Sequence, residues 1–269
     1  MSLARIVGLG FLALVLLGLA LFIASFMNYY NHDTGTSEAI GTPAGIAYTG
    51  PRTTALAGYY CIASMNSVNG YSIQLNAWLS NGLFVQNVYG NPVIEESFNG
   101  GPWVTYTGFI DNVWVKNANG TPVLIHANNP IITNANCAWL VIALRDGNVY
   151  FGYSLDGRSI TWYDSYPAGD ASYIVPSGFM GELTGMVIGG PGYGSQAQLG
   201  SGTLVYLALY YWDGASWLPA RVSLSTWQSP IIETVNHAWV FTGGKCGGAV
   251  SWPSPVNETQ CPAPPGFKP

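Results

Sequence analysis

YSIQLNAWLSNGLFVQNVYG, residues 71–90, contains two runs of strand-forming residues separated by Asn81-Gly82. Asn-Gly tolerates the positive φ angles of a two-residue hairpin turn, so we predict a β-hairpin here. Side chains alternate between the two faces of a strand, and this turn leaves Gln86 alone among apolar residues. The opposite face carries Gln74, Asn76, Trp78, Val85, Asn87 and Tyr89. Either Gln86 is a core amide that bonds to the backbone and the opposite face is ordinary wet sheet surface, or that face lines a cleft or a polysaccharide platform.

Turn pairs of the same kind recur along the chain, and they separate short apolar or alternating runs. Residues 143–164 are predicted to form three successive strands, and residues 203–222 a further hairpin. No sustained helical period occurs beyond the N-terminal segment. We therefore predict an all-β fold, an antiparallel β-sandwich or jelly-roll-like single domain over residues 58–242.

Three flanking segments complete the predicted organisation. Residues 1–29 are expected to form one hydrophobic helix, residues 30–57 a tether rich in Gly, Thr and Ser, and residues 243–269 a Pro/Gly-rich tail held by a disulfide. The apolar run from Ile6 to Met27 follows Arg5 and is long enough to span a bilayer. It is either a cleaved signal peptide or an uncleaved anchor, and both place the remaining chain outside the cytoplasm.

The four cysteines, Cys61, Cys137, Cys246 and Cys261, are typical of an exported protein with two disulfides. Three pairings are possible, and we favour Cys246–Cys261 because a short bridge would hold the loop-like tail. No C-x-x-C motif occurs and the three histidines are dispersed, so we expect no metal. Asn119 and Asn257 begin glycosylation sequons in turn-rich sequence.

Charged residues make up only 8% of the chain, and the net charge is −5. Eight scattered Lys and Arg residues cannot form a basic footprint, so nucleic acid is excluded as a partner. Acid unfolds proteins mainly by protonating carboxylates that the folded state needs ionised. A chain with so few ion pairs to lose is suited to an acidic habitat.

Carboxylates offer the best candidates for acid–base chemistry, because no Ser-His-Asp motif or metal site is evident. Asp111, Glu182 and Glu233 each lie among apolar residues, where burial raises a carboxyl pKa. Each alone is more often structural. The glycine-rich segment 189–195 lacks the G-K-[ST] ending of a phosphate loop, so Gly190 and Gly192 are better explained by close approach to a substrate or by positive φ angles.

Four stretches together resemble the thermopsin family of archaeal acid proteases: residues 71–90, 109–115, 185–220 and 231–239. The resemblance implies an exported acid endopeptidase with a β-rich fold, a polypeptide substrate and no cofactor. Carried over by position, it implies Gln86, Asn87 and the loop with Gly190 and Gly192 as substrate-binding residues. Asn76 and Trp78 join them as candidates because they share the predicted cleft-lining face of the hairpin. The family commonly has an Asp-Thr-Gly-Glu-Thr-like run where residues 229–234 here are Ser-Pro-Ile-Ile-Glu-Thr, so only Glu233 remains of it.

The expected mechanism pairs two carboxyl groups that share one proton and activate water. We expect Asp111 and Glu233 to form this pair, with Glu182 as the third candidate and Gln86 as a donor to the oxyanion. Glu182 lies a few positions before the place where the family often has an acidic residue, so an inactive relative is also possible.

Two other functions remain open. One is a cell-surface or filament protein that self-associates, which abundant Gly, Tyr and amides would suit. The other is a carbohydrate-binding or carbohydrate-cleaving jelly roll. In it, aromatic side chains stack on sugars and two carboxylates cleave them; the candidates for stacking are Trp78, Trp103, Trp114 and Tyr89.

Overall fold

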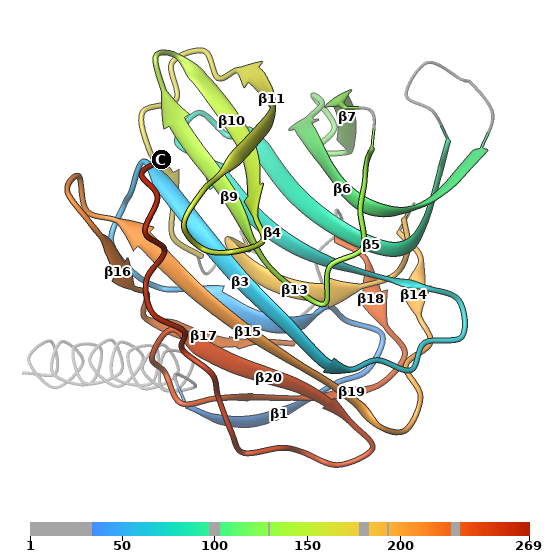
Figure 1. The fold of residues 1–269 in the computed structure, drawn as a ribbon. Coiled ribbons are helices and arrows are strands. Elements are labelled where there is room, and N and C mark those ends of the chain that lie inside the picture. Colours follow the sequence, from blue (N-terminus) through green and yellow to red (C-terminus); the bar gives the residue numbers. More distant parts are fainter. Residues whose placement is uncertain (1–33, 97–102, 129, 178–182, 193, 227–231) are drawn as a thin grey trace, which may run out of the picture.

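The computed structural model describes residues 34–96, 103–128, 130–177, 183–192, 194–226 and 232–269, apart from the side chains of residues 93–104 (Figure 1). The described residues form strands and loops, as the all-β prediction requires. Within these ranges, no helix has the length and hydrophobicity that a membrane crossing needs. The predicted N-terminal helix and signal or anchor segment, residues 1–29, lie outside the described residues.

The first sheet has nine strands in the order β1-β19-β20-β15-β3-β9-β10-β11, with β16 paired to β15. Its strands are β1 (Gly35–Ala39), β3 (Ala55–Ser64), β9 (Cys137–Arg145), β10 (Asn148–Ser154), β11 (Thr161–Pro167), β15 (Thr203–Trp212), β16 (Trp217–Pro219), β19 (Ala238–Thr242) and β20 (Gly247–Trp252). Every pairing in it is antiparallel. The three strands predicted within residues 143–164 are confirmed as the end of β9, β10 and the start of β11.

The second sheet also has nine strands, in the order β17-β2-β13-β4-β5-β6-β7, with β12 paired to β4 and β8 to β6. Its strands are β2 (Ala44–Tyr48), β4 (Tyr71–Leu79), β5 (Phe84–Glu96), β6 (Trp103–Lys116), β7 (Pro122–Ala127), β8 (Ile131–Ile132), β12 (Ile174–Val175), β13 (Gly185–Gly189) and β17 (Val222–Ser225). A parallel pair, β14 (Gln196–Ala197) and β18 (Thr234–Val235), lies apart from both sheets.

The two sheets face each other across one large apolar core, in the sandwich-like arrangement that the turn pattern predicts (Figure 1). Leu75 and Phe109 of the second sheet belong to this core, as do Leu140 and Leu207 of the first. We call the face of the second sheet that points into this core the inner face, and the opposite one the outer face. Burial of apolar side chains from both sheets provides the main driving force for the fold.

The opening hairpin exists, but its register differs from the prediction by one residue. Asn76 pairs with Gln86, and Leu75 pairs with Asn87. The loop has three residues instead of two, because Leu79 and Leu83 close it by a hydrogen bond and Gly82 adopts a φ of 86°. A shift of one residue exchanges the two faces of a strand. Gln86 therefore lies on the outer face with Asn76, and Asn87 points into the core.

The predicted tether and tail are both partly wrong. Strand β1 pairs with β19, and β2 lies between β17 and β13 with all five residues buried, so residues 34–57 belong to the folded domain. The segment predicted as a tail begins with β20, which pairs with both β15 and β19. Its Gly and Pro content hid a strand that is buried between two neighbours.

Two disulfides are present. Cys246–Cys261 confirms the predicted short bridge, and Cys61–Cys137 joins two residues that face each other on the paired strands β3 and β9. Disulfides of this kind are typical of proteins that fold in an oxidising compartment. Asn119 and Asn257 are both exposed, so glycosylation of either is sterically allowed.

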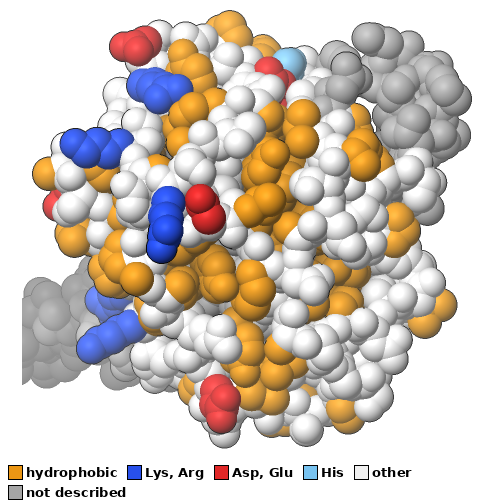
Figure 2. Space-filling model, viewed as in Figure 1, with side chains coloured by type: hydrophobic (Ala, Val, Ile, Leu, Met, Phe, Trp, Pro, Cys, Tyr) orange, Lys and Arg blue, Asp and Glu red, His pale blue; other side chains and the backbone are white. Residues whose placement is uncertain are grey.

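Charged side chains are few and lie scattered over the face shown in Figure 2, where apolar side chains form a band between them. This distribution agrees with the composition. It leaves polar but uncharged groups to supply most of the hydrophilic surface.

Candidate functional site

Three amide side chains lie side by side on the outer face of the second sheet. Gln74 and Asn76 project from β4, and Gln86 projects from β5 directly opposite Asn76. All three are almost completely buried, with exposed fractions of 1% for Gln74, 0% for Asn76 and 1% for Gln86. We call these three residues the amide network. A buried amide is costly unless its donors and acceptors are satisfied, so its bonds define its role.

The hydrogen bonds of the amide network lead from Trp114 through Gln86 to Gln74 and Asn76. The indole Nε1 of Trp114 donates to Gln86 Oε1 at 2.7 Å. Gln86 Nε2 donates to Gln74 Oε1 and to Asn76 Oδ1, both at 3.1 Å. Both hydrogens of the Gln86 amide are therefore used within the network. Gln86 orients its neighbours and has no free donor for an oxyanion, contrary to the predicted role.

Glu233 ends this chain of hydrogen bonds. Gln74 Nε2 donates to Glu233 Oε2 at 2.5 Å and to Ser72 Oγ at 2.8 Å. Burial raises the pKa of the Glu233 carboxyl, while hydrogen bonds from Gln74 and from the backbone N–H of Gly194 partly oppose that rise. Glu233 retains some solvent exposure, in contrast to the amides behind it. A carboxyl group with a raised pKa and a fixed orientation is suited to proton transfer at acidic pH.

The glycine-rich segment lies against this carboxyl group. A Cβ atom on Gly189 would stand 2.7 Å from Glu233 Cβ and 2.6 Å from its backbone oxygen, so a larger residue would displace Glu233. Gly190 accepts a hydrogen bond from Ser72 Oγ at 2.8 Å, and Gly192 N–H donates to Ser195 Oγ at 3.1 Å. The absence of side chains here allows the backbone to approach the amide network and Glu233 closely.

An apolar cluster lies on the same outer face as the amide network. Trp78 and Phe84 pack against each other with their ring centroids 5.0 Å apart, and Leu183 and Ile232 join the same cluster. Trp78 is therefore largely buried, and its ring is not a stacking platform open to solvent. Glu182, the third predicted catalytic residue, lies outside the described residues.

Asn87 has a different surrounding from the one predicted. Its Nδ2 donates to the backbone oxygens of Val141 at 2.9 Å and Gly152 at 2.8 Å, both in the first sheet. Tyr163 OH donates to Asn87 Oδ1 at 2.8 Å. Asn87 is fully buried and joins the two sheets, so the prediction that it contacts a substrate is wrong.

Asp111 lies beside Asn87 on the inner face, paired with it across β5 and β6. Its side chain is 0% exposed, and a second carboxylate and an imidazole lie close to it. One potential ligand atom from each of Asp111, His126 and Asp164 lies within 4.8 Å of the other two. Burial, followed by the charge of Asp164, raises the pKa of Asp111 to about 9.

The structure does not bring Asp111 and Glu233 together as a pair. Glu233 bonds to Gln74 on the outer face, whereas Asp111 points into the core on the inner face. Two groups of polar residues therefore exist on opposite sides of one sheet. Gln74, His126 and Asp164 are their members that the sequence analysis did not select.

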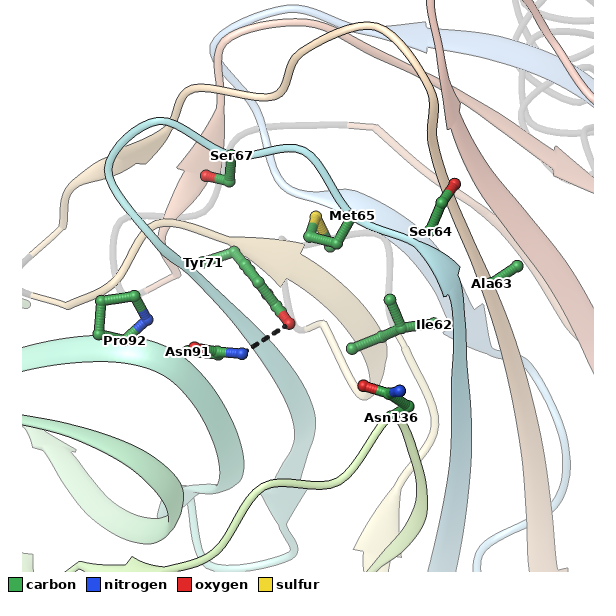
Figure 3. Close-up of a pocket in the computed structure, with 9 residues that line it drawn as sticks. All are labelled: Ile62, Ala63, Ser64, Met65, Ser67, Tyr71, Asn91, Pro92 and Asn136. Carbon is green, nitrogen blue, oxygen red and sulfur yellow. Dashed lines mark hydrogen bonds between the residues drawn. The ribbon is translucent and has the colours of Figure 1, made fainter.

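The groove shown in Figure 3 lies apart from both groups and has a volume of about 390 Å³. Tyr71 OH lies 3.4 Å from Asn91 Nδ2 within it. Its lining is Ile62, Ala63, Ser64, Met65, Ser67, Tyr71, Asn91, Pro92 and Asn136. These residues carry no carboxyl, imidazole or thiol group, and the one titratable side chain among them is Tyr71, whose pKa burial raises to about 12.

Comparisons with known proteins do not assign the chain to a family. No known protein-family model matches the sequence, and a search of curated proteins finds no significant match. A solved structure described as a functionally unknown protein from Saccharomyces cerevisiae aligns over 82% of this chain and 88% of its own, with 10% identity and a TM-score of 0.27.

Proposed function

We propose that this protein is an exported acid endopeptidase, similar in activity to the thermopsin family, in which Glu233 is the catalytic residue. The hydrogen bond from Gln74 Nε2 to Glu233 Oε2, at 2.5 Å, carries this proposal. It fixes the carboxyl group of a partly exposed residue, with a pKa raised by burial, at the end of an otherwise closed polar network. Glu233 is also the acidic residue that remains from the run that resembles the family.

Glu233 is better suited to this role than the buried carboxyl of Asp111. A catalytic group must reach the substrate, and Asp111 has no exposed surface. Glu233 also lies against the glycine-rich segment, whose backbone packs directly on it because Gly189 has no Cβ.

At acidic pH the raised pKa keeps Glu233 protonated, so one group supplies both a donor and an acceptor. Its O–H gives a proton to the scissile carbonyl oxygen while water attacks the carbonyl carbon. Its other oxygen takes a proton from that water, which forms a neutral gem-diol and restores the carboxylic acid. Collapse of the gem-diol transfers a proton to the leaving nitrogen and breaks the C–N bond. The sequence consumes one water and needs no cofactor.

The amide network is a positioning device in this mechanism. Both hydrogens of Gln74 Nε2 are used, one on Ser72 and one on Glu233, and its oxygen accepts from Gln86. A side chain held at both ends cannot rotate, so the Glu233 carboxyl keeps one orientation. Preorganisation of this kind lowers the cost of reaching the transition state.

A carbohydrate-active function has less support, since the Trp78 ring is packed under neighbouring side chains. Export is supported by the two disulfides and by the hydrophobic N-terminal sequence. We also propose that the two sheets follow the strand order of a jelly roll.

A digest of casein by the purified full chain at pH 3 and elevated temperature tests the activity. We expect peptides from the wild type and from Glu38→Gln, a control that alters a carboxyl of β1, and none from Glu233→Gln. Cleavage of a polysaccharide panel instead, or assembly into filaments without any cleavage, would contradict the proposal and support one of the other two functions.

A further inference from the structure

The Asp111, His126 and Asp164 group lies where the open edges of the two sheets meet. His126 is on β7, the edge strand of the second sheet, and Asp164 is on β11, the edge strand of the first. Asp111 is on β6, next to β7. His126 Nε2 lies 2.8 Å from Asp164 Oδ2 and 3.7 Å from Asp111 Oδ2. Three potential ligands, two carboxylates and one imidazole, therefore converge from three strands.

Asp111 is the unusual member of this group. Neither of its carboxylate oxygens accepts a hydrogen bond from an N–H or hydroxyl group within the part of the chain that the structure describes, although the residue is 0% exposed; the polar groups beside it are the Asp164 carboxyl and the His126 imidazole. Ionising a buried carboxyl group is costly unless a charge or a set of hydrogen-bond donors compensates it. Its backbone N–H, in contrast, donates to Asn128 Oδ1 at 2.9 Å. The main chain is satisfied and the side chain points at the two other ligands.

The geometry matches what a divalent cation requires. Ligand atoms that surround Zn²⁺ tetrahedrally, at about 2.1 Å from the metal, are about 3.4 Å apart. The two His126 distances of 2.8 and 3.7 Å lie on either side of that value. Two carboxylates balance the charge of a divalent ion, which makes its burial near the core favourable. One imidazole beside two carboxylates selects first-row ions such as Zn²⁺ over Mg²⁺.

We propose that Asp111, His126 and Asp164 form a binding site for a first-row divalent cation of the zinc class, which joins the edges of the two sheets. The ion supplies the partner that the Asp111 carboxylate lacks. It also links β6 and β7 to β11, whose direct contacts include the His126–Asp164 bond and the packing of His126 on Tyr166, with ring centroids 5.1 Å apart. The site is independent of the proposed peptidase function, since it lies on the inner face.

Zinc binding to the EDTA-treated and desalted full chain at pH 7 tests the site, measured by titration calorimetry and by metal analysis. We expect one Zn²⁺ per chain, together with a rise in the thermal unfolding midpoint. His126→Gln and Asp164→Asn should each weaken binding by about tenfold or more, since even partners of metal ligands have effects of that size. His237→Gln is the matched control, because His237 also contacts a carboxylate, that of Glu38, and it should bind zinc like the wild type.

Failure of the wild type to retain zinc would overturn the proposal. Equal binding by His126→Gln and the wild type would overturn it as well. Anomalous scattering from a zinc-soaked crystal of the wild-type protein gives a second measurement that does not depend on how the variants fold. A peak between the three side chains supports the site, and peaks only elsewhere contradict it.

Discussion

Gln74 and Glu233 are joined by a 2.5 Å hydrogen bond although they are 159 positions apart in the sequence. The bond connects a fully buried strand residue to a glutamate that is partly exposed as a residue and whose carboxyl pKa is raised by burial. Every donor of the Gln74 amide is occupied, so the position of Glu233 depends on the whole amide network behind it. A substitution in the amide network should therefore change the properties of Glu233, and measurements of activity can detect that change.

Replacement of Gln74 by Met should raise the pKa of Glu233, because the hydrogen bond from Gln74 lowers that pKa. In the wild type, activity should fall as pH rises through the Glu233 pKa. In Gln74→Met the falling limb of the kcat/KM profile should move to higher pH. We also expect a loss of about 1–3 kcal/mol in the free energy of unfolding, since Gln86 and Asn76 lose their partner. An unchanged limb with reduced stability would mean that Gln74 is structural only.

Gly189→Ala should reduce activity at pH 3 strongly, because the added Cβ would overlap Glu233. Gly243→Ala is the matched control, since a Cβ there meets nothing within 4 Å. Initial rates of peptide cleavage for the two variants provide the measurement. Equal rates would show that the glycine-rich segment does not set the position of Glu233.

The two disulfides should differ in their effect on stability. Cys61–Cys137 closes a loop of 76 positions and Cys246–Cys261 one of 15, so the entropy of loop closure predicts a difference of about 1.4 kcal/mol. Paired Cys→Ser variants should therefore lose more stability when the long loop is opened. Denaturant unfolding measures both, and the reverse order would contradict the prediction.

The metal-free protein should become less stable as pH rises from about 4 to about 9. Asp111 has its pKa raised from 3.8 to about 9, so the folded state holds a proton that the unfolded chain releases. Its contribution is fully present below the unfolded pKa and is lost towards the folded pKa, by up to about 1.4 kcal/mol per pH unit. Asp111→Asn should flatten this dependence, whereas Asp170→Asn, at an exposed position, should leave it intact. Urea unfolding in EDTA across this pH range provides the measurement, and a slope of the opposite sign would contradict it.

Local sequence signals predicted the positions of the strands better than they predicted which face of a sheet each side chain occupies. Asn81-Gly82 located the hairpin, but nothing local distinguishes a two-residue turn from the three-residue loop that forms, and that one residue exchanged Gln86 and Asn87. Glu233 was a candidate because it lies among apolar residues. Gln74, buried between Ile73 and Leu75 with Asn76 on the same face, carried a similar signal that was assigned to a wet surface.

The meeting of His126 with Asp164 could not be predicted in this way. They are 38 positions apart on edge strands of different sheets, and their contact depends on how the sandwich closes. The predicted tether failed for a related reason, because small residues in β2 are selected by close packing between neighbouring strands. A Cβ on Gly45 would stand 2.0 Å from the backbone oxygen of Met186.

In the proposed mechanism, Glu233 performs the proton transfers of peptide hydrolysis. The most direct test is kcat/KM at pH 3 on one quenched fluorescent peptide, for the wild type, Glu233→Gln and the control Glu38→Gln. We expect Glu233→Gln to lower kcat/KM by about 10²–10⁴-fold and Glu38→Gln to leave it unchanged. Full activity in Glu233→Gln, with loss of activity in Asp164→Asn, would contradict the account and place the reaction on the inner face.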